Sequence, residues 1–307
     1  MRFSIDPWDP SYGSANEVEG LEESEAEVRL DVEVPADRWA PRRPVGSQPV
    51  SPRILFVDGV RRVDARIWIE AAGGPARPGI CATYAAGAVR CDGSARMGAV
   101  VVGRSVLSAG PTEAVVTSAG SYLPGPAPSG TVEGLALALQ QQMAEAEVAA
   151  AERACAEEDA DLLIVDGPLR GRQHLPGAVG YIKTHHVAYL PPEQQAVVAQ
   201  LSPGARTPLF VIGSGWSRQS WYLRLPSDGR SPWSGVVRCE CPVDLPPSEA
   251  IDLADAVTAV LPRFASEAHK DPRAPQNLYP IAGLERELRH RLGDVSLVYR
   301  ALRTAAG

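Results

Sequence analysis

The sequence predicts an α/β fold in which helices flank a mixed sheet. The first observation is that RILFVDGV at 53–60 and DLLIVDGPLRG at 161–171 each run four apolar residues into an aspartate followed by glycine. Such a run between turn-forming residues is typical of a strand that is covered on both faces. The second observation is a segment rich in alanine, leucine and glutamine from about Thr131 to Glu158, which predicts a long helix between the two strands.

Further elements are expected on both sides of this helix. Before it, strands are predicted at 53–58, 65–71 and 97–107, and Ser129 or Thr131 is expected to cap the helix. After it, the pattern predicts strands at 178–190, 207–213, 220–226 and 235–242, a short helix at 191–201, and helices at about 247–265 and 278–304.

Length and composition indicate a globular protein, and a length near 300 residues permits one large domain or two small ones. Of the 307 residues, 45% are hydrophobic and 22% are charged, which is ordinary for such a domain. We expect an acidic, flexible N-terminal extension and linker at 1–50 and a single domain at 51–307. No apolar run approaches the roughly 20 residues of a membrane span, and the first residues do not resemble a signal peptide. We therefore expect a cytoplasmic protein with no membrane partner.

The acidic net charge of −7 is concentrated near the N-terminus. Residues 17–38 hold nine acids and two arginines, whereas residues 44–307 hold 25 basic and 26 acidic residues. The main part of the chain is therefore close to neutral, and a rim around a cluster of acids could still be basic enough to hold phosphates. The charge does not exclude DNA as a partner.

The cysteine, histidine and glycine patterns predict neither a zinc site nor a nucleotide cofactor. The five cysteines form no C-x-x-C pair, so reduced thiols are expected rather than disulfides or a zinc knuckle. His185 and His186 would point to opposite faces of a strand, which is poor geometry for binding one zinc ion. No phosphate-binding glycine motif occurs, so no nucleotide cofactor is expected.

Three acidic residues stand where one site could use them. Asp58 and Asp166 end two strands, and ligands of open α/β sheets bind beyond the carboxyl ends of strands, although Asp166 could instead cap a turn. Glu133 lies in the first helical turn, where the helix dipole also favours an acid. This order of strands, helix and acids is that of a ribonuclease H-like fold. Carboxylate oxygens are the ligands that Mg²⁺ and Mn²⁺ prefer, and two such ions about 4 Å apart can support phosphodiester cleavage.

Six segments resemble sequence motifs of the NurA nuclease family, and they occur in the same order along the chain as in that family. They are FVDGV at 56–60, GTVEG at 130–134, LLIVDGPL at 162–169, GYIKTH at 180–185, SWYLRLP at 220–226 and LYP at 278–280. The resemblance implies a ribonuclease H-like, Piwi-related core and a nuclease that acts on DNA ends with Mn²⁺ or Mg²⁺. It also implies a homodimer and a partnership with the hexameric translocase ATPase HerA.

The resemblance assigns roles to individual residues. Asp58, Glu133 and Asp166 would be the metal-binding carboxylates, and Lys183 would pair with the scissile phosphate. The alternative for Lys183 is an ordinary solvated lysine on a strand.

The last helix departs from the family pattern, which has a histidine about two turns after Tyr-Pro. In LYPIAGLERELRHRL, Glu287 falls near that place and His290 lies one turn further on. Glu287, Glu285 or His290 could supply a fourth ligand, but surface salt bridges with the neighbouring arginines are an equal alternative.

The resulting prediction is a metal-dependent DNA nuclease that processes ends or single strands beside a HerA-type translocase. One alternative is an inactive ribonuclease H-like adaptor of the translocase, and another is a related enzyme that acts on RNA or on a junction. Trp216, Trp221 and Tyr222 could stack unpaired bases or fill the core. The sequence leaves open the digestion polarity, the preferred metal, a role in repair or in defence, and whether the isolated protein is active without its partner.

Overall fold

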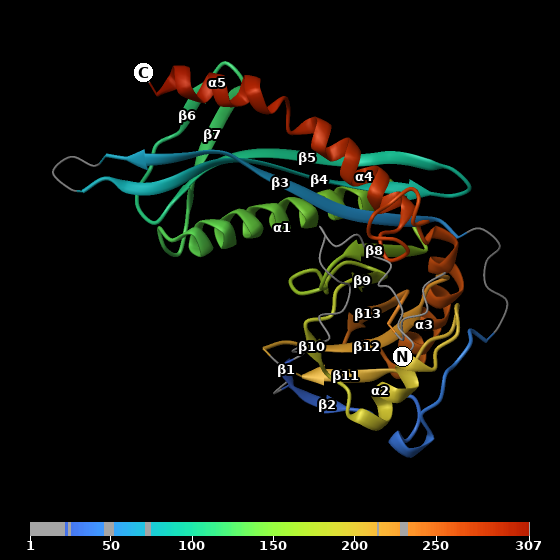
Figure 1. Cartoon of the computed structure of the whole chain (residues 1–307). Coiled ribbons are helices and arrows are strands. Elements are labelled where there is room, and N and C mark those ends of the chain that lie inside the picture. The colour runs from blue at the N-terminus through green and yellow to red at the C-terminus, as the bar shows by residue number, and fades with distance from the viewer. Residues whose placement is uncertain are drawn as a thin grey trace, which may run out of the picture. The chain divides into compact units, whose positions relative to one another are not determined.

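The computed structural model describes residues 22–23, 26–45, 52–70, 75–213, 215–227 and 233–306. It is a mixed α/β structure with a large mixed sheet and helices, as predicted (Figure 1). The chain divides into two compact units. The first unit comprises Met1–Phe56, Cys91–Ser94 and Ala160–Ala282, and the second unit comprises Val57–Arg90, Ala95–Asp159 and Gly283–Gly307.

The first unit is built on strands in the order β2, β11, β12, β13, β9 and β8. Their bounds are β2 (Glu27–Arg29), β11 (Phe210–Gly213), β12 (Ser217–Arg224), β13 (Val236–Pro242), β9 (Ala178–Ile182) and β8 (Leu162–Asp166). Neighbours are antiparallel from β2 to β9, whereas β8 and β9 are parallel. The remaining elements are the parallel pair β1 (Glu22–Glu23) and β10 (Val187–Ala188), helices α2 (Pro192–Ala199) and α3 (Pro247–Val260), and the 3-10 helices η2 (Ala36–Arg38) and η3 (Leu261–Phe264).

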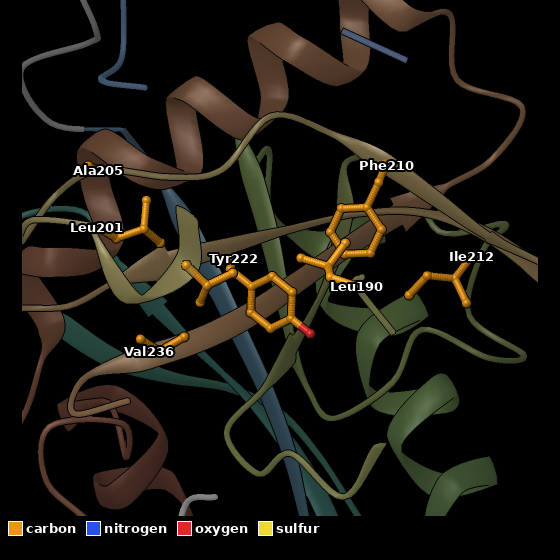
Figure 2. Packing of buried hydrophobic residues seen from close by; sticks show 8 residues of the cluster. Leu190, Leu201, Ala205, Phe210, Ile212, Tyr222 and Val236 are labelled. Carbon is orange, nitrogen blue, oxygen red and sulfur yellow. The ribbon is translucent and has the colours of Figure 1, made fainter. Parts of the chain in front are cut away.

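An apolar cluster fills one side of this sheet (Figure 2). Phe210 and Ile212 are buried while Val211 between them is partly exposed, because successive side chains of a strand point to opposite faces. The rings of Phe210 and Tyr222 stack with their centroids 5.9 Å apart. Val28 packs against the same cluster, so part of the predicted N-terminal extension belongs to this core.

A buried arginine joins that N-terminal segment to the rest of the first unit. The guanidinium of Arg206 donates to both carboxylate oxygens of Glu33 at 2.8 and 3.0 Å, and to Oδ1 of Asp255 at 2.7 Å. Glu33 also accepts a hydrogen bond from the amide of Leu209 at 2.9 Å. Burial opposes the charged form, but the two carboxylates raise the pKa of Arg206. Each charge is buried only because its partners are present.

The second unit is built on strands in the order β3, β4, β5, β7 and β6. Their bounds are β3 (Ile54–Ile69), β4 (Arg77–Cys91), β5 (Ala95–Ser108), β7 (Gly120–Pro126) and β6 (Val115–Thr117). The helices are α1 (Val132–Glu157), α4 (Tyr279–Arg291) and α5 (Val295–Ala305). Strand β3 and helix α4 each begin in the first unit and continue in the second.

Helix α1 closely matches its predicted range. Oγ1 of Thr131 accepts a hydrogen bond from the amide of Gly134 at 3.1 Å, so Thr131 is the N-cap. Among the described residues, no helix is both long and apolar enough to cross a membrane.

Two strand predictions in the second unit are wrong. Residues 54–58 and 65–69 belong to one strand, β3, where two strands were predicted, and residue 71 lies outside the described residues. Strand β4 forms from a glycine- and alanine-rich passage for which no strand was predicted. The small residues have a packing reason. A Cβ on Gly87 would lie 3.2 Å from Leu288 and 3.4 Å from Leu284 of helix α4. Close approach of a helix therefore selects small side chains here, and this hides the alternating pattern of a strand.

The single helix predicted at 278–304 is two helices. Gly293 between them has φ of +82°, which favours glycine. Oδ1 of Asp294 then accepts from the amide of Leu297 at 2.9 Å and caps α5. Arg62 of β3 donates to the carbonyl oxygens of Leu292 at 3.0 Å and Gly293 at 2.8 Å. The positive φ of Gly293 and the hydrogen bonds from Arg62 end α4, although the hydrophobic periodicity of the sequence would allow the helix to continue.

We expect Arg206→Met to destabilise the first unit by about 3–5 kcal/mol, because Asp255 would be left buried without its cation and Glu33 would keep only the half-exposed Arg42, at 2.7 Å. Urea unfolding followed by intrinsic fluorescence measures the change. Arg53→Met is the matched control, because Arg53 pairs with Asp161 at 3.2 Å with both side chains about 40% exposed. That change should cost about 1 kcal/mol or less, and equal losses in both variants would contradict the assignment.

Candidate active-site residues

Asp166 and Lys183 form a mostly buried ion pair in the first unit. Asp166 ends β8, and Lys183 follows the end of the neighbouring parallel strand β9. Nζ of Lys183 donates to Oδ2 of Asp166 at 2.7 Å, and the two side chains are 13% and 16% exposed. The same Nζ donates to Oδ1 of Asn277 at 3.1 Å. Lys183 is therefore not a solvated strand lysine.

The turn after Asp166 is stabilised by other groups. Gly167 has φ of +94°, and its amide donates to the carbonyl oxygen of Tyr181 at 2.8 Å. The amide of Leu169 donates to Oε1 of the buried Glu240 at 2.6 Å. Because these two amides have partners, the carboxylate of Asp166 is not required as a cap for them.

Asp58 lies within β3 of the second unit and does not end a strand as predicted, because β3 continues to Ile69. The next residue, Gly59, packs against a glutamate that was not predicted from the sequence. Asp58 is 8% exposed, and its Oδ1 accepts a hydrogen bond from the amide of Gly59 at 2.7 Å. A Cβ on Gly59 would lie 2.5 Å from Oε1 of Glu147 and 2.9 Å from Met143 of α1. Glu147 is only 3% exposed. Glu147 precedes Ala150 and Ala151 by one helical turn, so its place on the alanine-rich face of α1 was the signal available in the sequence.

Glu133 lies far from this pair along the same helix. Glu133 precedes Glu147 by 14 residues, which corresponds to about 21 Å along a helix. Packing agrees with this separation, since Leu135 contacts the cluster around Ile80, whereas Ala150 contacts Ala86. Glu133 is exposed in the first turn. The structure therefore places Glu147 beside Gly59, the residue that follows Asp58, and places Glu133 near the start of the same helix.

The three candidates in the last helix fall on different sides of α4. A cavity of about 870 Å³ in the second unit is lined by Gly59, Glu285 and His290 together with residues of α1 and of the turn before α5. Glu285 pairs with Arg289 at 2.6 Å. Glu287 does not line this cavity, and it pairs with Arg291 at 2.9 Å. The salt bridges that the sequence allowed are both present.

The carboxylates suit a hard divalent ion by chemistry, but each unit holds only part of the predicted set. Asp58 and Glu133 belong to the second unit and Asp166 to the first. Across the described ranges, no three histidine, cysteine, aspartate or glutamate side chains are grouped as metal ligands. Oxygen donors remain the ligands that Mg²⁺ and Mn²⁺ prefer.

His185 and most of the aromatic residues considered for stacking serve the core, whereas His186 is exposed. His185 is buried with its ring 5.6 Å from that of Tyr222, and its Nε2 lies 3.2 Å from the carbonyl oxygen of Val236. Trp221 is fully buried. Trp216 is partly exposed, and the guanidinium of Arg218 lies 4.7 Å from the centre of its ring. Of the three aromatic residues considered for stacking, only Trp216 reaches the surface.

A mixed sheet with an acid paired to lysine at a strand end defines an α/β protein with a candidate active site. The NurA domain model matches residues 132–287, which is 156 of the 307 residues and just over half of the chain. The chain belongs to the NurA family, a family of nucleases. A search of curated proteins finds no match. The family match contains Asp166 and Lys183 but begins after Asp58.

Acid should destabilise the first unit through His185. Burial lowers the pKa of His185 from its usual 6.5 to about 4. Between these pH values the unfolded chain binds a proton that the folded chain does not, so stability is complete above pH 6.5 and falls as the pH drops towards 4. The loss should reach about 3 kcal/mol, since one pKa unit corresponds to about 1.4 kcal/mol.

Urea unfolding midpoints of the wild type and His185→Gln between pH 7.5 and 4.5 measure this effect. His185→Gln should lose less stability over this range, while His269→Gln should behave like the wild type because His269 is exposed. Equal acid sensitivity of His185→Gln and the wild type would contradict the assignment.

Proposed function

We propose that the protein is a divalent-metal-dependent deoxyribonuclease with a ribonuclease H-like core that processes DNA ends or single strands. The observation that carries this proposal is membership of a nuclease family together with the Asp166–Lys183 ion pair inside the matched segment. A HerA-type hexameric translocase is the proposed partner, and a homodimer is the proposed assembly. Both of these follow from the family resemblance.

In this proposal, Asp58, Asp166 and a glutamate of α1 bind Mn²⁺ or Mg²⁺. The bound ions would activate the attacking water and stabilise the leaving oxygen. Asp166 also holds the ammonium group of Lys183, which can donate a charge-assisted hydrogen bond to a phosphate oxygen of the substrate. The protein groups thus orient the phosphate and balance its charge.

The pairing of Asp58 with Asp166 in one metal site rests on the family resemblance. Within the first unit, the carbonyl oxygen of Arg53 accepts hydrogen bonds from the amides of Asp161 at 2.8 Å and Leu162 at 3.3 Å. These bonds fix the start of β8, the strand that Asp166 ends.

Asp58→Asn and Asp166→Asn should each lower DNA cleavage at least 100-fold, because each removes a charge from the proposed metal site while keeping the side-chain shape. Blunt duplex, single-stranded DNA and RNA are incubated with Mn²⁺, Mg²⁺ or EDTA, and calorimetry measures Mn²⁺ uptake. Asp252→Asn on the exposed face of α3 is the control and should cleave like the wild type. Full activity of both site variants, or activity in EDTA, would overturn the proposal, and preferential cleavage of RNA would change the substrate.

The glutamate of α1 is proposed to be Glu133 by resemblance, or Glu147 by its position beside Gly59. Comparison of Glu133→Gln with Glu147→Gln separates them, since the residue that binds metal should lose at least tenfold in cleavage and weaken Mn²⁺ binding. The geometry favours Glu147. Glu145→Gln is the matched control, because Glu145 is exposed two residues before Glu147. A loss in Glu133→Gln alone would support the resemblance against the geometry.

An inactive adaptor of the translocase is the second candidate. The observation that favours it is the ion pair of Glu287 with Arg291 at the place where the family pattern has a histidine. The adaptor role predicts that the wild type cleaves no substrate with either metal while a HerA-type hexamer still binds it in a pull-down. Cleavage that depends on Asp58 and Asp166 would exclude the adaptor.

A further inference from the structure

Lysine is rare in this chain, and one of its two lysines is mostly buried. Among the 30 basic residues, only Lys183 and Lys270 are lysines, and the other 28 are arginines. Lys270 is 53% exposed and forms a surface pair with Glu267 at 3.0 Å. Lys183 instead lies inside the first unit against Asp166. An ammonium group is a compact charge with three donors, whereas the guanidinium of arginine is a planar fork. The position of Lys183 therefore suits an ammonium in particular.

Lys183 lies within a chain of four polar side chains. Its Nζ donates to Oδ2 of Asp166 at 2.7 Å and to Oδ1 of Asn277 at 3.1 Å. Nδ2 of Asn277 in turn donates to Oδ2 of Asp271 at 2.7 Å. Asn277 is fully buried and Asp271 is 9% exposed. The donation to Asp271 settles which end of the amide faces Lys183, because only the oxygen remains to accept from the ammonium.

The loop before α4 holds Asn277 in this orientation. Oδ1 of Asp271 accepts from the amide of Arg273 at 2.8 Å, and the amide of Asn277 donates to the carbonyl oxygen of Arg273 at 3.0 Å. The hydroxyl of Tyr181 donates to the carbonyl oxygen of Gln276 at 2.7 Å. These bonds fix the loop from both sides of Asn277, so its amide can serve as a rigid acceptor.

We propose that Asn277, oriented by Asp271, is a positioning residue that aims Lys183 at a phosphate oxygen of the nucleic-acid substrate. This inference rests on the proposed nuclease function. Two of the three ammonium protons are directed to Asp166 and Asn277, which leaves the third for the substrate. A neutral amide fixes the direction of the ammonium without adding a second negative charge beside Lys183. A carboxylate in its place would compete with the phosphate for the cation.

The direct test measures how fast Lys183 reacts with an amine-acylating reagent such as an N-hydroxysuccinimide ester. Peptide mass spectrometry reports each lysine separately, and the exposed Lys270 is an internal reference in every sample. Asn277→Leu should raise the Lys183 rate relative to Lys270 at least fivefold, because one of its two acceptors is lost. Asp271→Asn keeps an oxygen that can accept a hydrogen bond from Asn277. It should therefore raise the Lys183 rate less than Asn277→Leu does. An unchanged ratio in Asn277→Leu would overturn the proposal.

Tyr181→Phe controls for simple loosening of the loop, because it removes a different hydrogen bond to the same segment. Its labelling ratio should stay within twofold of the wild type. A rise equal to that of Asn277→Leu would assign the effect to loop stability and not to positioning. If Asn277→Leu does not fold, as judged by thermal unfolding, Asp271→Asn carries the test and must raise the ratio at least twofold.

Cleavage kinetics test whether positioning serves the reaction. Asn277→Leu should lower the single-turnover rate at least tenfold while DNA affinity changes less than threefold, and it should have no further effect in a Lys183→Met background. Equal losses in both backgrounds would overturn the proposal. A wild type that cleaves nothing would refute the nuclease function, whereas the labelling ratio would still decide whether Asn277 positions Lys183.

Discussion

The ion pair of Asp166 with Lys183 is the interaction on which the candidate active site depends. A carboxylate at the end of a central strand and a mostly buried ammonium would each be costly alone, and each makes the other tolerable. Their partners then constrain the surroundings. Asn277 accepts from the same ammonium, and Asp271 orients Asn277. A single charge pair thus links two parallel strands to the loop that precedes α4.

In the second unit, close packing at glycines determines how near helices α1 and α4 lie to the strands. The absence of a side chain at Gly59 allows α1 to approach β3, and this approach places Glu147 next to the residue that follows Asp58. Gly87 similarly allows α4 to lie against β4. Small residues in these strands are therefore part of how acidic side chains are positioned, because only a short distance between backbones lets a helix carboxylate reach a strand.

Family membership and the chemistry around Lys183 independently support the proposed nuclease function. The family match covers residues 132–287, from α1 into α4, and the mostly buried Lys183 proposed to bind phosphate lies within it. The last helix contributes differently from the family pattern, since Glu287 pairs with Arg291 while Glu285 and His290 line the cavity beside Gly59. If a fourth group takes part in the reaction, the cavity favours these two residues over Glu287.

The sequence alone determined the mixed α/β class, the family, the long helix from Thr131 and the strand that ends in Asp166, because apolar runs, capping residues and helix propensity act locally. Tertiary structure decided what local patterns do not encode. Strand β3 continues through a charged segment in which the buried Asp64 accepts hydrogen bonds from Thr83 of β4 at 2.5 Å and Tyr122 of β7 at 2.9 Å, and α4 ends shortly before Gly293, which has a positive φ. Glu147 and Asn277 gained their places only through contacts between segments far apart in the chain. Such contacts depend on distance in space, which residue spacing does not measure.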